Sequence, residues 1–222
     1  MAIRPTEMVF ILDRSGSMSG LERDTIGGFN SMIAKQKKEE GRAYVTTVLF
    51  SDSMSILHDR VDIQSVQPLT EKQYFTGGGT ALYDAVGNTV ARIMMQQRMA
   101  DDSQRSKVVV VITTDGEENS SREYQQKQIK NLIEKQRTAD EWEFLFLGAN
   151  IDAAEAAQNV GIPVEQAVRY HSDSIGTGVA YASVSKAVSR MRSGAPLGAW
   201  SEEITADFES RQAGETPEEP KK

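Results

Sequence analysis

The chain of 222 residues contains no cysteine and only two histidines. The absence of cysteine excludes disulfide bridges, zinc–thiolate sites and cysteine nucleophiles. The histidines, His58 and His171, lie far apart in the sequence without the paired spacing of metal ligands, so both are expected to be structural or surface residues. Any metal site in this chain must then rely on oxygen ligands, which favours a hard cation.

Long apolar runs and clusters of basic residues are also missing. No segment reaches the roughly 18–20 apolar residues of a membrane helix, and the run Met8–Leu12 is too short for an export signal. We therefore expect a soluble, cytoplasmic protein with no membrane partner. The formal net charge is -7 and the lysines and arginines form no block, so a nucleic-acid partner is not expected. The chain has no Gly-x-x-x-x-Gly-Lys-Ser/Thr motif, which argues against a P-loop NTPase.

The last segment, Ser201–Lys222, is acidic and has few large apolar residues. This composition is typical of a disordered chain, because little apolar surface is available for burial. We predict one domain over residues 1–200, followed by an acidic, flexible C-terminal tail over residues 201–222.

Before that tail, short apolar runs alternate with longer stretches of helical spacing. Four runs suit strands buried on both faces: Met8–Leu12, Tyr44–Phe50, Val108–Ile112 and Phe144–Leu147. The stretches between them repeat apolar residues every three or four positions, which predicts amphipathic helices. This alternation predicts an α/β fold, a Rossmann-like doubly wound sheet of mainly parallel strands with helices on both faces.

Two further strands are expected at the edges of this sheet. Met54–Arg60 follows Phe50 after only a short polar segment, which is too short for a helical crossover. We therefore predict an antiparallel edge strand there. Val164–Tyr170 is a weaker candidate for the opposite edge.

Acidic and hydroxyl side chains directly follow two of the predicted strands. Asp13, Ser15 and Ser17 follow the first strand, and Asp115 follows the strand Val108–Ile112. In an open parallel sheet, ligands bind outside the carboxyl ends of the strands, where the strand order reverses. Two carboxylates brought together there repel each other unless a cation lies between them or one is protonated. The pattern predicts a site for a hard divalent cation, Mg²⁺ first, with Mn²⁺ and Ca²⁺ as alternatives.

A third element, Gly77-Gly78-Gly79-Thr80, leads into the second predicted helix. Thr80 can offer a hydroxyl to the site, although a threonine at a helix start is also an ordinary N-cap. Each of the three elements is a weak signal in isolation. Their order, each at a strand-to-helix turn, makes the combination specific.

Together the three elements resemble the metal-ion-dependent adhesion site of von Willebrand factor A domains. The matching segments are Val9–Met18, Thr76–Ala85 and Val110–Glu117. The resemblance covers roughly residues 6–195 and is to small intracellular bacterial and phage members of that family. It implies five parallel strands with one antiparallel edge strand, and a complete ligand set of Asp13, Ser15, Ser17, Thr80 and Asp115.

The resemblance also implies a function. Members of the family are usually binding modules, so we expect no enzyme activity and a protein partner that supplies an acidic residue to the metal. A metal-assisted, phosphatase-like hydrolase at the same site is the alternative. Haloacid-dehalogenase phosphatases carry a second carboxylate two residues after their nucleophile, where this chain has Ser15. No histidine is positioned as a general base, and the oligomeric state is left open.

Four more residues are predicted in the second shell or at the rim of the metal site: Asp84, Glu117, Gly16 and Gly79. Asp84 lies one helical turn after Thr80, so we expect it to orient Thr80 or a metal-bound water, with a solvated helix charge as the alternative. The neighbouring Glu118 is expected to be an exposed loop acid.

Overall fold

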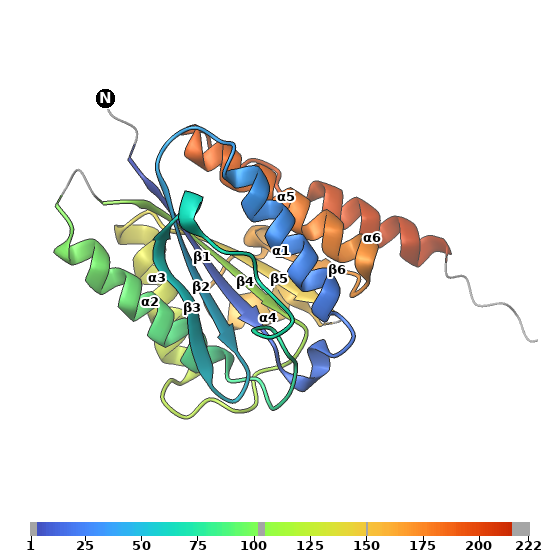
Figure 1. Cartoon of the computed structure of the whole chain (residues 1–222). Coiled ribbons are helices and arrows are strands. Elements are labelled where there is room, and N and C mark those ends of the chain that lie inside the picture. Colours follow the sequence, from blue (N-terminus) through green and yellow to red (C-terminus); the bar gives the residue numbers. More distant parts are fainter. Residues whose placement is uncertain (1–3, 102–104, 150, 215–222) are drawn as a thin grey trace, which may run out of the picture.

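The computed structural model describes residues 4–101, 105–149 and 151–214. Strands and helices alternate along the chain (Figure 1). In chain order the elements are β1 (Thr6–Asp13), η1 (Gly16–Met18), α1 (Glu22–Gln36), β2 (Ala43–Phe50), β3 (Met54–Asp62), η2 (Ile63–Ser65), α2 (Leu82–Met99), β4 (Lys107–Thr114), α3 (Gln126–Ala139), β5 (Glu143–Ala149), α4 (Ala153–Asn159), η3 (Val164–Gln166), β6 (Ala167–Tyr170), α5 (Ser174–Arg192) and α6 (Glu202–Gly214).

The six strands form one sheet in the order β3-β2-β1-β4-β5-β6. All neighbouring pairs are parallel except β2 and β3, which are antiparallel. The predicted sheet is confirmed, including the antiparallel strand at one edge and the short strand at the other. The chain builds outward from β1 to β3 and then restarts at β4, on the other side of β1. The strand order therefore reverses between β1 and β4, where ligands bind in folds of this kind.

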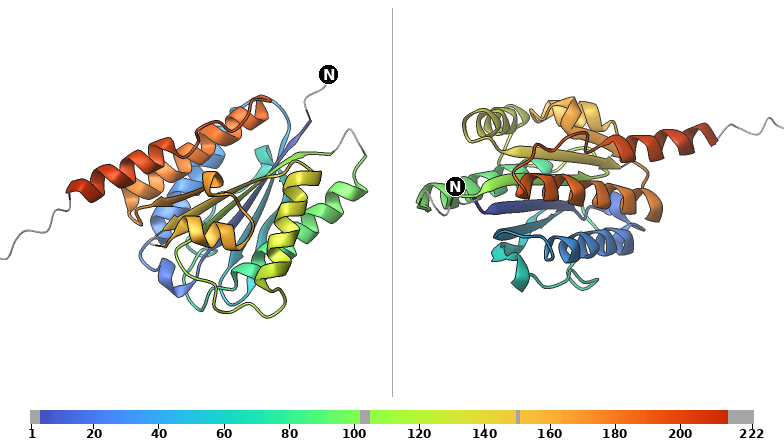
Figure 2. Two further views of the ribbon diagram at one scale, coloured as in Figure 1. Left: turned by 180° about the vertical axis from the view of Figure 1, so that it is seen from behind. Right: turned by 90° about the horizontal axis from the view of Figure 1, so that it is seen from above.

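Strand β1 shows why an unbroken apolar run suits the centre of this sheet. Met8, Phe10 and Leu12 face one core with α1 and α5, while Val9 and Ile11 face a second core with α2 and α3. Successive side chains of a strand point to opposite faces, so the middle of a strand that is covered on both sides, here Met8–Leu12, is apolar at every position. Figure 2 shows helices covering both faces. Within the described part of the chain, no helix is long and apolar enough to cross a membrane.

The prediction of a flexible tail over residues 201–222 is wrong for its first part. Residues Glu202–Gly214 form helix α6, which lies against α5 and β6 (Figure 2). Ile204 is buried in the core, the ring of Phe208 stacks on His171, and Arg211 bridges Asp173 and Asp207. Apart from the Arg211–Asp207 pair within the helix, these contacts come from residues distant in sequence, so composition did not reveal them. Residues 215–222 of the predicted tail lie outside the described residues.

Candidate metal centre

Three loops meet at the carboxyl ends of β1 and β4. The first follows Asp13, the second contains the three glycines before Thr80, and the third follows Thr114. Backbone hydrogen bonds join the first two loops: the Gly16 N–H donates to the Gly78 carbonyl at 3.0 Å, and the Gly77 N–H donates to the Arg14 carbonyl at 2.9 Å. The structure therefore brings together the three sequence elements at the predicted point in the sheet.

The three predicted hydroxyl ligands converge beside Gly116. An added Cβ atom on Gly116 would lie 3.0 Å from Thr80 Oγ1, 3.1 Å from Ser17 Oγ and 3.9 Å from Ser15 Oγ. Ser17 Oγ donates to Asp115 Oδ1 at 2.6 Å. Because that bond uses the hydroxyl proton of Ser17, the 3.0 Å contact between the two serine oxygens has Ser15 as its donor. The three hydroxyls and one carboxylate thus share a single small volume, which a side chain at position 116 would enter.

Asp13 is fully buried beneath this volume. Its Oδ1 accepts the Ser15 N–H at 2.7 Å, and its Oδ2 accepts the Thr114 hydroxyl at 2.6 Å. The Tyr74 hydroxyl donates to the main-chain carbonyl of Asp13. Thr114 and Tyr74 fix the position of Asp13 on both sides, and the sequence reasoning identified neither. The sequence offered one signal for Thr114: it directly precedes Asp115, and it is a polar residue at the end of a strand whose middle is apolar.

Both carboxylates are electrostatically strained. Burial raises the pKa of Asp13, hydrogen bonds from Thr114 and Ser15 lower it in part, and the neighbouring Asp115 raises it further. Burial likewise raises the pKa of Asp115, against the hydrogen bond from Ser17. Among the described residues, no lysine, arginine or histidine side chain pairs with either carboxylate. Two buried carboxylates without a cationic partner raise each other's free energy, and a divalent cation would relieve that.

The donor set fits a hard cation. All five predicted ligands offer oxygen, and oxygen donors suit Mg²⁺, Mn²⁺ and Ca²⁺. Within the described ranges no group of three or more His, Cys, Asp or Glu residues is placed to hold a metal. The two carboxylates can balance the charge of one divalent ion, and the hydroxyls supply the remaining protein donors. The residues present therefore fit the cation that the sequence predicts, and its binding stays a prediction.

The glycines before Thr80 allow a close approach between loops. Gly78 has a φ of 80°, a left-handed conformation that glycine adopts without strain. A Cβ on Gly79 would lie 2.1 Å from Ser120 Oγ and 2.8 Å from Asn119 Oδ1. The same Asn119 oxygen accepts the Thr80 N–H at 2.9 Å. Gly79 thus packs against the third loop, and its place at the rim of a metal site stays a prediction. Asn119, which the sequence reasoning missed, fixes the backbone of Thr80.

The side chain of Asp84 binds backbone N–H groups of the third loop. Its carboxylate accepts the N–H groups of Arg122 at 2.8 Å, Glu123 at 2.9 Å and Tyr124 at 2.8 Å. Loop anchorage is therefore the role that the structure shows for Asp84. Its expected part in orienting Thr80 or a metal-bound water stays a prediction.

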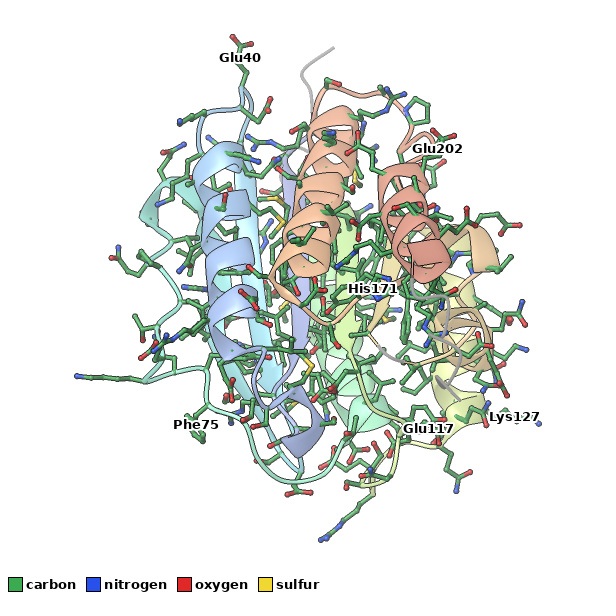
Figure 3. The ribbon with its side chains drawn as sticks, turned by 90° about the vertical axis from the view of Figure 1, so that its right-hand side faces the viewer. Glu40, Phe75, Glu117, Lys127, His171 and Glu202 are labelled. Atoms are coloured by element: carbon green, nitrogen blue, oxygen red, sulfur yellow. The ribbon has the colours of Figure 1, made fainter. Side chains whose placement is uncertain are left out.

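Glu118 differs from the expected exposed loop acid. It is half-buried, and its Oε2 accepts the Tyr83 N–H at the start of α2 at 2.9 Å. Its Oε1 accepts the backbone N–H groups of Ser120 and Ser121 at 2.9 and 2.8 Å. A carboxylate at a helix N-terminus satisfies free N–H groups and interacts favourably with the helix dipole, so Glu118 joins the third loop to the start of α2. Glu117 is exposed at the same end of the molecule (Figure 3), and its place at the rim stays a prediction.

Solved structures with the same fold support this arrangement of elements. A structure of proximal thread matrix protein 1 from the mussel byssus superposes with a TM-score of 0.56 at 16% sequence identity, over 84% of this chain and 46% of that one. BatB from Bacteroides thetaiotaomicron gives a TM-score of 0.53 at 14% identity, over 85% of this chain and 99% of that one. Manganese-loaded TRAP protein from Plasmodium vivax gives 0.50 at 17% identity, over 67% of this chain and 58% of that one.

This chain therefore spans just under half the length of the mussel relative. At these identities the likeness shows the fold alone. No curated protein sequence matches the chain. The family profile described as von Willebrand factor type A domain matches residues 7–162, from β1 to the segment before β6. This match covers more than half of the sequence, and the chain belongs to the von Willebrand factor type A domain family.

Proposed function

We propose that this chain is a metal-dependent protein-interaction module, which binds an acidic side chain of a partner protein through a divalent cation. The observation that carries the proposal is the convergence of three hydroxyls beside two buried carboxylates that lack a cationic partner. Members of the family commonly mediate metal-dependent protein interactions, which supports this reading.

In this proposal Ser15, Ser17 and Thr80 hold the cation directly, and Asp13 and Asp115 hold it directly or through water. The bound cation would supply an open coordination position for a carboxylate. Asp13 is kept in place by the Ser15 N–H and the Thr114 hydroxyl, so its carboxylate would contribute its negative charge without a change of conformation. Ser17 and Gly16 are exposed, which leaves the site open to a partner at the surface.

We propose Mg²⁺ as the cation, because hydroxyl and carboxylate oxygens suit a hard ion. The manganese-loaded Plasmodium vivax protein supports a divalent cation in this fold. A cytoplasmic location and a bacterial or phage origin also stay part of the proposal. We propose no catalytic residue: both oxygens of Asp13 already accept hydrogen bonds, and its side chain is fully buried, so it is not presented as a nucleophile.

Metal binding is tested first, with the purified protein and Mn²⁺, whose electron paramagnetic resonance signal falls when the ion binds. We expect one site, competed by Mg²⁺, and loss of binding in Asp13→Ala. The matched control is Asp140→Ala, which removes an exposed carboxylate at the end of α3. Equal Mn²⁺ binding by wild type and Asp13→Ala would refute the assignment of the site.

Partner binding is tested by capture on immobilised protein in Mg²⁺ buffer, followed by release with EDTA. The proposal expects a partner that Asp140→Ala retains and that Asp13→Ala and EDTA both lose. A partner that stays bound both to Asp13→Ala and in EDTA would refute the proposal. Turnover of phosphoester substrates with Mg²⁺, abolished by Asp13→Ala, would instead establish the hydrolase.

A further inference from the structure

An aromatic side chain lies exposed beside the metal-binding loop. Phe75 is 59% exposed, on the segment between Tyr74 and the glycines of the second loop. The guanidinium carbon of Arg14 lies 4.8 Å from the centre of its ring. Arg14 stands between Asp13 and Ser15 in the first loop. Figure 3 shows Phe75 and Glu117 on opposite sides of the same end of the molecule.

The backbone on both sides of Phe75 is tied to the first loop and to the helix that follows it. The Tyr74 hydroxyl donates to the Asp13 carbonyl, and the Gly77 N–H donates to the Arg14 carbonyl at 2.9 Å. The Thr76 hydroxyl donates to Glu22 Oε1 at 2.6 Å. The ring is therefore held in solvent by fixed neighbours, and little conformational entropy would be lost when a partner covers it.

Arg14 is incompletely satisfied where it stacks on Phe75. Its Nε is buried without a hydrogen-bond partner, and its Nη1 makes one long bond of 3.4 Å to the Gln73 carbonyl. Among the ion pairs of the described residues, none involves Arg14. Its positive charge is thus uncompensated, next to a site that binds a cation and, through it, an acid. Aromatic and arginine side chains often contribute most of the binding energy of an interface, especially where they give up few hydrogen bonds to water on binding.

We propose that Phe75 and Arg14, the Phe75 platform, bind an aromatic side chain of the partner that lies one to three residues from its metal-bound acid. This inference rests on the proposed function and names the partner sequence that the site prefers. Arg14 directly precedes Ser15, and its carbonyl accepts the Gly77 N–H, so the platform adjoins the first loop. An extended partner chain advances roughly 3.3 Å per residue, which is why the spacing is tested over one to three residues. Aromatic rings pair favourably with one another beyond the area that they bury, so an aromatic residue is preferred to an aliphatic one.

The test uses fluorescein-labelled peptides and fluorescence anisotropy with the full chain in Mg²⁺ buffer. One set carries Asp with Phe at one, two or three positions from it on either side. A second set has Ala in place of Phe, and a third has Asn in place of Asp. We expect the best Asp–Phe peptide to bind about tenfold more tightly than its Asp–Ala counterpart, and the Asn peptides and all peptides in EDTA to bind no better than background.

Phe75→Ala should remove the tenfold advantage of the Asp–Phe peptide and leave the weaker binding of the Asp–Ala peptide. Met99→Ala is the matched control, since Met99 is 79% exposed and lies at the far end of α2. Mn²⁺ affinity is measured on both variants, to separate loss of metal from loss of the platform. Equal binding of Asp–Phe and Asp–Ala peptides, or an advantage that survives Phe75→Ala, overturns this inference alone. If no Asp peptide binds in a metal-dependent manner, the proposed function fails and the inference fails with it.

Discussion

Replacing Asp13 by asparagine should separate two effects on the stability of the fold: the destabilisation by two neighbouring buried carboxylates without metal, and the stabilisation by a bound metal. Asparagine has nearly the same shape as aspartate, and its Oδ1 can still accept the Ser15 N–H. Its amide group can donate to the Thr114 hydroxyl, whose own proton can turn to the Gly116 carbonyl at 3.1 Å. The substitution therefore keeps the hydrogen bonds and removes one of two buried negative charges. We expect the metal-free Asp13→Asn protein to be at least as stable as the metal-free wild type.

The effect of the metal should run in the opposite direction. A ligand that binds only the folded state at a free concentration of about 100 times its Kd adds roughly 2.7 kcal/mol of stability. For a domain of about 150–250 residues, 1 kcal/mol shifts the melting temperature by roughly 2–4 °C. Saturating Mg²⁺ should therefore raise the melting temperature of the wild type by about 5–11 °C. The Asp13→Asn variant has lost a charged ligand, so its melting temperature should hardly change.

The measurement is differential scanning calorimetry of both proteins, in Mg²⁺ and in EDTA, with Asp140→Asn as the surface control. The order of stability should invert between the two buffers. A metal-free variant that melts well below the metal-free wild type would show that the Asp13 charge stabilises the fold without a cation. Equal Mg²⁺ stabilisation of both proteins would show that the ion binds elsewhere. Either result refutes the reasoning.

Three other substitutions test parts of the fold and of the site. Arg60→Ala leaves the buried Glu7, which it meets at 3.2 Å, without a counter-ion, so urea unfolding should show a loss of about 2–3 kcal/mol at neutral pH. Burial already raises the Glu7 pKa, and the stability deficit should shrink as the pH falls through that pKa and the carboxyl becomes neutral; a deficit that grows on acidification contradicts this. Gly79→Ala should weaken Mn²⁺ binding about tenfold in the same resonance assay, and an unchanged affinity would show that the loop tolerates a Cβ. Glu118→Ala should lower stability by about 1–2 kcal/mol through loss of the helix cap, and no change in the urea midpoint would contradict its anchoring role.

The sheet could be predicted from the sequence because burial on both faces requires unbroken apolar runs in its central strands. The middle of β1, Met8–Leu12, is buried on both faces and apolar at every position, and the polar residues that begin at Asp13 then mark the end of the strand. The short turn after Phe50 likewise excluded a crossover and identified the antiparallel edge. Local patterns of this kind do not depend on distant residues, and they were therefore readable from the sequence.

Helix α6 could not be predicted in the same way. Its sequence is acidic, and it buries few large side chains, among them Ile204. It is held instead by the stacking of Phe208 on His171 and by the ion pairs of Arg211. Each of those contacts needs a residue more than 30 positions away, apart from the pair within the helix itself. A composition argument counts apolar residues in the segment and cannot count partners elsewhere in the chain.

The residues of the site likewise fall into two groups, those marked by local sequence patterns and those that act through contacts with distant residues. The five residues predicted as ligands could be placed at one end of the sheet because each follows a strand or opens a helix, and local sequence dictates those positions; their role as ligands stays a prediction. The residues that hold them could not be placed in this way, since Tyr74, Asn119 and Glu118 each bond to a residue at least 35 positions away in the sequence. Preorganised ligands lose less entropy on binding than mobile ones, so these long-range contacts, more than the ligand types, should determine the affinity for the metal. In the proposed site, ligand identity would then determine which ion binds, and the contacts between the loops would determine its affinity.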